Sequence, residues 1–295
     1  MSSGPRFGKR RWRRPERMML EGPDAVRRKD LGVSEPMALE TELVRRTSRR
    51  QLEILMLSFF AFAALEGIVI GFFVRHPVIG AATGVALAAA YFLVTREFGD
   101  TWFVRILKAK PVDGTRTLRL ASSEARSAGI PAPRVLVSPG DVPNALSFAL
   151  RRRWIVTTQA AEQLDELALE GVLAHEIVHL RDGEATVASL FVALCAGPEL
   201  VLRGAGVLPA LSLPLWPSAM LLRLVRPLVT SRDREHRADI AGALLTRYPP
   251  GIEAALRAAG GDSAGLPLLD PFWFVARDGR AAAETERRAA LVAEM

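Results

Sequence analysis

Cysteine is almost absent from this chain of 295 residues, which contains one, Cys195. A single cysteine excludes an intrachain disulfide and suits a domain that faces the cytoplasm. A secretory signal peptide is not expected, because the first apolar run begins near Leu52 and no small-residue cleavage site follows it. Histidine is also scarce, with four residues in all, so a pattern that uses two of them is informative.

Net charge is absent from most of the chain. Residues 1–50 contain fourteen Lys or Arg and seven Asp or Glu, a balance of +7 that equals the charge of the whole protein, so the remainder sums to zero. This pattern predicts a basic, largely disordered cytoplasmic arm that binds an anionic membrane surface. Nucleic acid is the rival partner. No stacking aromatics or recognised binding fold accompany the arm, so no nucleic-acid partner is expected.

Two apolar runs follow the arm. Residues 55–74 and 77–95 are each long enough to cross a bilayer, and so short a connection between them predicts an antiparallel transmembrane helical hairpin over residues 51–96. Lys and Arg residues flank both ends of the hairpin, which places both ends and the following domain in the cytoplasm. The sequence therefore predicts a multi-pass protein of the cell (inner) membrane.

Within the hairpin, glycines lie at matching distances from the turn. Gly71 and Gly80 form one such pair, and Gly67 and Gly84 form the other. Small residues let two helix backbones approach closely, so contact at these positions is expected. Glu66 lies deep in the first run and requires a partner or a watery cavity, because a carboxylate is costly in hydrocarbon.

Residues 174–180 contain the pattern His-Glu-x-x-His, formed by His175, Glu176 and His179. Two histidines four residues apart lie on one face of a helix, so both imidazoles can bind one ion. Glu176 lies beside that ion, placed to accept a proton from the attacking water. Because a five-residue pattern can arise by chance, a third ligand is needed to support a zinc site.

The third ligand is expected from a later helix. A histidine six residues after the second one would mark one class of zinc protease, but Ala185 stands there and excludes that class. The other class uses a carboxylate. Residues 231–243 predict a helix with Glu235 and Asp239 on one face, so Glu235 can complete the site and Asp239 can accept a ring N–H from a ligand histidine. His236 is the rival ligand, although it points away from that face, and a solvated charged helix is the plain alternative.

These segments resemble the HtpX family of membrane zinc proteases, relatives of the CAAX prenyl proteases. The matching residues are Val-Leu-Ala-His-Glu-x-x-His at 172–179, Ser-Arg-x-Arg-Glu-x-x-Ala-Asp-x-x-Gly-Ala at 231–243, Pro143-Asn144-Ala145, and Gly183-Glu184. The resemblance runs from about residue 55 to residue 291. It implies one Zn²⁺ per chain and an α+β fold, in which the hairpin precedes a mainly helical, zincin-like metallopeptidase domain with a small β-sheet at residues 97–295.

Short strands are expected at residues 134–138, 145–150 and 153–158, from apolar or β-branched alternation. In zinc proteases an edge strand beside the metal helix holds the substrate extended. The third strand is the candidate for that edge, with core packing as its alternative role. The residues expected to bind substrate are Asn144, Ala145, Trp154, Ile155 and Val156.

The sequence departs from the family at two places. A hydrophobic helical insertion at residues 185–229 corresponds to two further membrane segments in the family, but its prolines and Glu199 also fit a pair that only dips into the membrane. The family's His-Pro before the last helix is Asp270-Pro271 here, and Arg287 occupies the apparent place of the arginine that follows. The absence of this histidine bears on turnover or substrate range.

The resemblance implies a membrane-anchored zinc endopeptidase that cleaves polypeptides, above all damaged or misassembled membrane proteins, in quality control. Two other functions remain open. One is a maturation protease for a single defined, lipidated protein. The other is an inactive membrane adaptor that retained the metal fold, against which the presence of Glu176 argues, since an inactive protein needs no general base.

Overall fold

The computed structural model describes residues 35–295 except 205, 230–232, 260–268, 270–271 and 276–280. The chain divides into two units, Met1–Thr41 and Glu42–Met295. The fold and the candidate site belong to the second unit. The basic arm predicted for residues 1–50 lies mostly outside the described residues, as does the Asp270-Pro271 departure.

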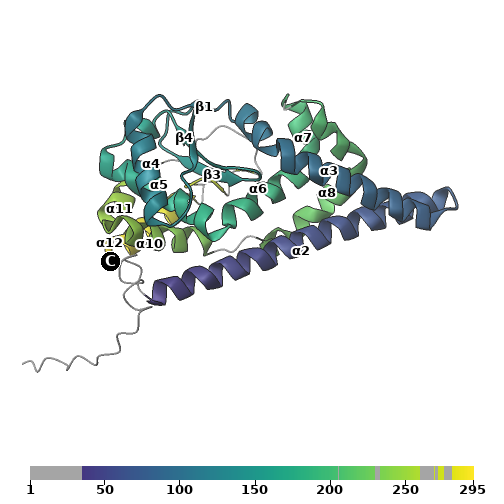
Figure 1. The fold of residues 1–295 in the computed structure, drawn as a ribbon, viewed down its shortest axis with the longest axis horizontal. Coiled ribbons are helices and arrows are strands. Elements are labelled where there is room, and N and C mark those ends of the chain that lie inside the picture. The colour runs from purple at the N-terminus through teal and green to yellow at the C-terminus, as the bar shows by residue number, and fades with distance from the viewer. Residues whose placement is uncertain (1–34, 205, 230–232, 260–268, 270–271, 276–280) are drawn as a thin grey trace, which may run out of the picture. The chain divides into compact units, whose positions relative to one another are not determined.

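The part of the chain that the structure describes is mainly helical, with one small mixed sheet and apolar helices toward its N-terminus (Figure 1). Among the described residues, three stretches are long and apolar enough to cross a membrane: residues 40–73, 77–106 and 208–228. The first two correspond to the predicted apolar runs. The third lies in the predicted insertion, which is the part of the chain whose spanning the sequence left open.

The first two apolar stretches belong to α2 (Glu35–Phe73) and α3 (Pro77–Ile106). Residues 37–50 are helical and continuous with the first apolar run, because nothing in the sequence between them breaks a helix. Three residues connect α2 to α3, and Arg75 adopts a left-handed φ of 63° there. Proline at the first position of α3 fits the start of a helix, where its missing N–H removes no helical hydrogen bond.

Glycines bring the backbones of α2 and α3 together. Gly80 lies between Gly67 and Gly71, and an added Cβ at Gly80 would overlap the Gly67 carbonyl oxygen and lie 2.8 Å from Gly71 Cα. An added Cβ at Gly84 would overlap the carbonyl oxygen of Ala63 and lie 3.4 Å from Gly67 Cα. Both predicted glycine pairs are therefore in contact, although the closest approach is displaced by one helical turn.

The sheet has the order β1-β2-β4-β3. Its strands are β1 (Lys110–Pro111), β2 (Arg134–Ser138), β3 (Ala145–Ala149) and β4 (Arg153–Thr158). β2 and β4 are parallel, while β1 pairs with β2 and β3 pairs with β4 in the antiparallel sense. The helix α4 (Thr115–Ser127) packs against α5 (Glu166–Asp182), which also contacts β3 and β4 (Figure 1).

The predicted edge strand is an interior strand. The expectation that Trp154, Ile155 and Val156 present a free edge is wrong, because β4 pairs with β2 on one side and with β3 on the other. Its backbone groups are therefore committed to the sheet. β3, which begins at Ala145, is the outer strand beside the helix that carries the two histidines.

The insertion between the two predicted metal segments is a series of short helices. They are α6 (Glu184–Cys195), α7 (Gly197–Leu202), η2 (Leu208–Leu215), α8 (Trp216–Leu222), η3 (Arg223–Val225) and α9 (Arg226–Val229). Glycine and proline at the starts of α7, η2 and α8 explain the breaks. The buried end of this series supplies the partner that Glu66 requires: the Glu66 carboxylate accepts hydrogen bonds from the backbone N–H of Ser218, at 3.2 Å, and from its hydroxyl.

Of the C-terminal helices that the structure describes, α10 (Arg234–Thr246) and α11 (Pro249–Ala258) pack against α5, and α12 (Ala281–Ala293) packs against α11 and α10. Gly171 of α5 lies against the backbone of α11, where an added Cβ would be 2.8 Å from Ile252 N. This close packing leaves nearly every residue of α5 buried. The second unit also ties α2 to α5, since Arg45 Nε donates to the carbonyl oxygen of Arg181 at 3.0 Å.

Candidate metal centre

α5 holds both histidines in a fixed position. Its first turn is capped by Asp165, whose carboxylate accepts from the backbone N–H of Ala168 at 2.8 Å. Four apolar residues of α5 (Leu169, Leu173, Ile177 and Leu180) pack into one core cluster with α4 and the sheet. His175 and His179 lie one turn apart with ring centroids 4.7 Å from each other, and both are buried. Packing therefore fixes the two imidazoles before any ligand arrives.

α10 brings the carboxylate to them. Gly242 permits the close crossing, because an added Cβ there would lie 3.2 Å from the backbone nitrogen of His175. Asp239 and Glu235 lie on successive turns toward the start of the same helix. Glu235 and Asp239 share one face of α10, as the sequence predicted. The close crossing at Gly242 turns this face toward α5.

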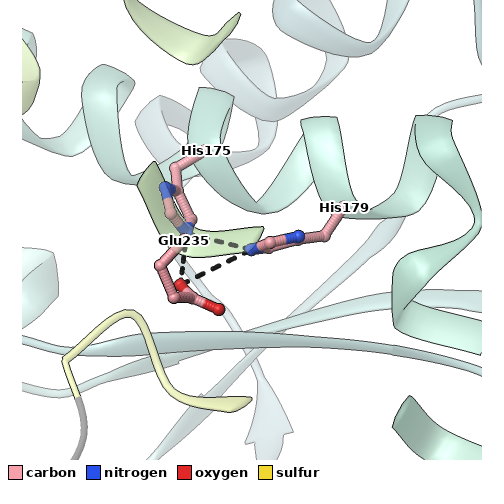
Figure 2. A group of neighbouring side chains, drawn as sticks. All are labelled: His175, His179 and Glu235. Atoms are coloured by element: carbon pink, nitrogen blue, oxygen red, sulfur yellow. Dashed lines mark hydrogen bonds and ion pairs between the residues drawn. The ribbon is translucent and has the colours of Figure 1, made fainter. Parts of the chain in front are cut away.

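The ligand atoms of His175, His179 and Glu235 all lie within 4.8 Å of one another and could hold a metal ion. Glu235 Oε2 is 3.1 Å from His175 Nε2 and 3.6 Å from His179 Nε2, and the two Nε2 atoms are 3.1 Å apart. Figure 2 shows the imidazoles and the carboxylate directed toward one another. His236, the rival ligand, does not belong to this group of residues.

The outer ring nitrogens show why a cation fits. His175 Nδ1 lies 2.9 Å from Asp239 Oδ1, and His179 Nδ1 lies 2.7 Å from Glu184 Oε2. Carboxylates accept hydrogen bonds, so in the neutral imidazoles both Nδ1 atoms carry the proton and both Nε2 atoms present lone pairs. Two lone pairs and a carboxylate that converge on one point are favourable only around a positive charge. The residues present therefore suit a divalent cation with nitrogen and oxygen ligands.

Glu176 is fully buried beside the histidines, and neither of its carboxylate oxygens has a hydrogen-bond partner within the described residues. A buried carboxylate without a partner is costly, and such groups mark places where a bound molecule completes the structure. The Glu176 carboxylate is therefore available to bind a water molecule at the site.

Glu184 and Arg288 also belong to the site. Glu184 was named from the sequence only as a match to the family, without a role, and Arg288 was not named. Arg288 binds the Asp239 carboxylate through two nitrogens, at 2.6 and 2.8 Å, and donates to the Phe274 carbonyl oxygen at 2.7 Å. Arg287, which the sequence favoured for this place, is mostly exposed and pairs with Glu284. The arginine of α12 that reaches the site is therefore Arg288, the residue after Arg287, because the side of α12 that carries Arg288 faces α10.

Ion pairs and hydrogen bonds between charged side chains shift the pKa values of the histidines and acids in the site. Burial alone would lower the pKa of His179, but Glu235 and Glu184 outweigh it and raise that pKa to about 9 in the absence of metal. Burial would raise the pKa of Asp239, but the hydrogen bonds from Arg288 and His175 hold it below its usual range. Glu235 is likewise held well below its usual pKa, chiefly by the charge of Arg234 against the effect of burial. Both acids are therefore ionised at neutral pH.

The residues expected to bind substrate fall into two groups. Asn144 and Ala145 begin β3 and lie next to the described segment Phe272–Val275, which contacts His175 through Phe274. Trp154 lies within the sheet, where its ring stacks on Phe148 at 5.9 Å. Ile155 and Val156 are fully buried core residues of β4. The structure thus brings only the first group toward the histidines.

Comparison with known proteins gives a consistent result. The sequence pattern described as Peptidase family M48 matches residues 115–259, which include both histidines and Glu235. The protein named "Protease HtpX homolog" from Listeria innocua serovar 6a is 26% identical over 256 residues, covering 73% of this chain and 83% of the relative. The homologue from Persephonella marina is 27% identical over 219 residues, covering 65% and 75%. That from Dictyoglomus thermophilum is 34% identical over 148 residues, covering 44% and 49%. None of the solved structures compared matches the chain.

The apolar helices and the histidine–carboxylate cluster, taken with these similarities, define a membrane-associated metalloendopeptidase. Its substrates are accordingly polypeptides. More narrowly, the chain is HtpX-like, and its residues 115–259 match the pattern of Peptidase family M48.

Proposed function

We propose that the protein hydrolyses peptide bonds with one Zn²⁺ ion per chain, held by His175, His179 and Glu235. The observation that carries the proposal is the convergence of two imidazole Nε2 atoms and one carboxylate, with the Nδ1 atom of each imidazole hydrogen-bonded to a further carboxylate. Two imidazoles and a carboxylate leave one position open, the composition typical of catalytic rather than structural zinc. Asp239 and Glu184 orient the ligands in this scheme.

Zn²⁺, when bound, supplies a Lewis acid that polarises the scissile carbonyl and acidifies water. Glu176 then acts as the general base: its carboxylate accepts a proton from the attacking water and returns it to the leaving amine. Within the described residues neither Glu176 oxygen has a hydrogen-bond partner, which supports this role, since a carboxylate already bound to a cation would be a poor base. Burial of the surrounding side chains keeps bulk water away from the reacting atoms.

The substrate is proposed to bind as an extended strand beside β3. Asn144 and Ala145 lie at the end of β3 nearest the histidines, and an outer strand offers backbone groups for pairing with a peptide. In this assignment Asn144 and Ala145 remain substrate-binding residues, and the strand that pairs with the substrate is β3 instead of β4. The surrounding peptidase domain, residues 97–295 with the insertion at 185–229, is proposed to be zincin-like.

We place the protein in the cell (inner) membrane as a multi-pass protein. α2 and α3 would form a transmembrane hairpin at residues 51–96, and the glycine contacts between them support that arrangement. The basic residues that flank the hairpin favour a cytoplasmic peptidase domain and arm. A cytoplasmic site next to the bilayer suits damaged or misassembled membrane proteins as substrates, in quality control.

Metal content and proteolysis in detergent test the enzymatic proposal directly. Wild type should contain one zinc per chain and cleave casein, whereas Glu176→Gln should contain the same zinc and cleave nothing. Zinc-loaded wild type without any proteolysis would favour an inactive adaptor. Cleavage of one membrane protein, with unrelated unfolded membrane proteins left intact, would favour a maturation protease.

The topology is tested by cysteine labelling with a membrane-impermeant reagent, after buried Cys195 is replaced by alanine. The exposed positions His76, Thr47 and Ser127 suit single-cysteine probes. A probe at His76 should react in intact cells, whereas probes at Thr47 and Ser127 should react only after lysis. Labelling of the Ser127 probe in intact cells would contradict a cytoplasmic peptidase domain.

A further inference from the structure

The outer edge of β3 is occupied by the chain itself. In the segment Phe272–Val275, Trp273 forms an isolated antiparallel bridge with Leu146 of β3. The backbone N–H of Phe274 donates to the carbonyl oxygen of Ala145 at 2.8 Å. This is the pairing by which an extended peptide adds to an exposed strand.

The side chain of Asn144 extends that pairing by one residue. Its Nδ2 donates to the carbonyl oxygen of Val275 at 2.8 Å, and its Oδ1 accepts from the N–H of Val275 at 3.1 Å. A carboxamide that binds both backbone groups of one residue imitates a further strand residue and recognises main chain rather than side chain. Asn144 is almost fully buried, so the bonds are made away from water.

The same segment reaches the proposed metal ligands. The Phe274 ring packs edge-on against the His175 ring, with centroids 4.8 Å apart, and the Arg288 guanidinium lies 5.3 Å from its centre. Arg288 also donates to the Phe274 carbonyl oxygen at 2.7 Å. All four residues of the segment are at most 4% exposed. The segment therefore contacts both β3 and the helix that carries the histidines, on the edge where the substrate strand is proposed to bind.

We infer that Phe272–Val275 is an internal occupant of the peptide-binding site, bound as a substrate strand would be and displaced when substrate enters. The inference rests on the proposed function. Asn144 and the Ala145 carbonyl oxygen cannot pair with two strands at once, so substrate and segment compete for them. The substrate class that follows is an extended peptide with a large aromatic or apolar residue at the place of Phe274, where the walls are an imidazole and a guanidinium.

Val275→Pro tests the competition in the full-length, zinc-loaded protein. Proline removes the N–H that Asn144 accepts but tolerates extended backbone, so the segment should bind more weakly and kcat/KM should rise by about fivefold, the usual effect of one net hydrogen bond. The control is Val275→Ala, which shortens the side chain and keeps the N–H, and it should give a smaller rise. A Val275→Pro protein no more active than Val275→Ala, or less active than wild type, would overturn the inference.

A peptide test does not depend on how the variant folds. The capped tetrapeptide Phe-Trp-Phe-Val, the sequence of residues 272–275, should inhibit wild type competitively. The same peptide N-methylated at its second phenylalanine lacks the N–H for Ala145 and should inhibit about fivefold more weakly. Equal inhibition by both peptides, or none by either, would count against the inference. If no zinc-loaded variant cleaves any substrate, the proposed function itself fails. If wild type cleaves but neither peptide competes, only the internal occupant is lost.

Discussion

His179 Nδ1 lies 2.7 Å from the carboxylate of Glu184, five residues further along the chain. The two residues are joined across the end of α5, where Gly183 adopts a φ of 81° and reverses the backbone so that α6 begins with Glu184. The other histidine is oriented from a distance, by Asp239 on α10. His179 is thus oriented by a residue close to it in the sequence, whereas His175 is oriented by a residue from another helix. Variants of the two carboxylates, Glu184 and Asp239, can therefore be compared directly.

Glu176→Gln should retain zinc and fold but lose proteolysis. The amide has nearly the same shape as the carboxylate and cannot take up the proton, and loss of a general base typically lowers kcat by about 10²–10⁴-fold. Zinc content, thermal unfolding and peptide hydrolysis in detergent should be measured on the same preparation. Near-normal turnover by the variant would remove Glu176 from the mechanism.

Glu235→Ala should lower zinc occupancy sharply, because two imidazoles alone leave the ion underligated. His236→Ala is the matched control, since His236 is the next residue on α10 and is absent from the ligand cluster. Equilibrium dialysis against a chelator would measure both variants. Loss of zinc in His236→Ala but not in Glu235→Ala would show that the third ligand is assigned wrongly.

Glu184→Gln and Asp239→Asn should each weaken zinc binding by about 10–100-fold, the usual effect of removing a carboxylate that orients a ligand histidine. Asp239→Asn should also lower the melting temperature more, because Asp239 alone of the two is held by buried Arg288. Zinc titration and thermal unfolding separate these effects. Unchanged zinc affinity in Glu184→Gln would mean that His179 needs no such support.

Gly80→Leu should destabilise the contact between α2 and α3. A side chain there must displace the backbone of Gly67, and an overpacked site costs about 1–3 kcal/mol. Gly114→Ala is the control, because its nearest neighbours would be 3.8 Å from the added Cβ. Thermal unfolding in detergent should show a lower midpoint for Gly80→Leu alone. Equal midpoints would indicate that the helices do not depend on this contact.

The stability of the peptidase domain should fall as pH rises through about 7. Burial, with the like charge of Glu170, raises the pKa of Glu124 from its usual value of 4.5 to about 7. The folded state therefore binds a proton that the unfolded state releases, and this stabilisation is complete below pH 4.5 and lost above pH 7. Glu124→Gln should remove this part of the pH dependence. Melting curves of both proteins between pH 5 and 8.5 would check it, and parallel curves would contradict it.

Local patterns in the sequence predicted local structure well. The alternation at residues 134–138 and 153–158 gave the bounds of β2 and β4. The order of the strands was not predictable in the same way. Which strand forms the edge depends on a parallel crossover between β2 and β4, and such pairing leaves no mark in the alternation of a single strand.

In the candidate site, too, local sequence patterns predicted some residues, while others depend on how the elements pack together. His175, Glu176 and His179 follow from a spacing within one helix, and the pair Glu235 and Asp239 follows from another. Glu184 matches the family in sequence, but its contact with His179 could not be predicted, because that contact requires the left-handed turn at Gly183. Neighbouring arginines on α12 point about 100° apart, so the choice of Arg288 over Arg287 depends on how that helix docks.

The hydrogen bond from Arg45 to the Arg181 carbonyl oxygen joins the first apolar helix to the end of the helix that carries the histidines. Within the second unit α2 continues without interruption from this contact into its apolar run. Helices in a bilayer change their tilt when the thickness of the hydrocarbon layer changes. A change in the tilt of α2 would therefore act, through the Arg45 hydrogen bond, on the backbone of Arg181, two residues after His179.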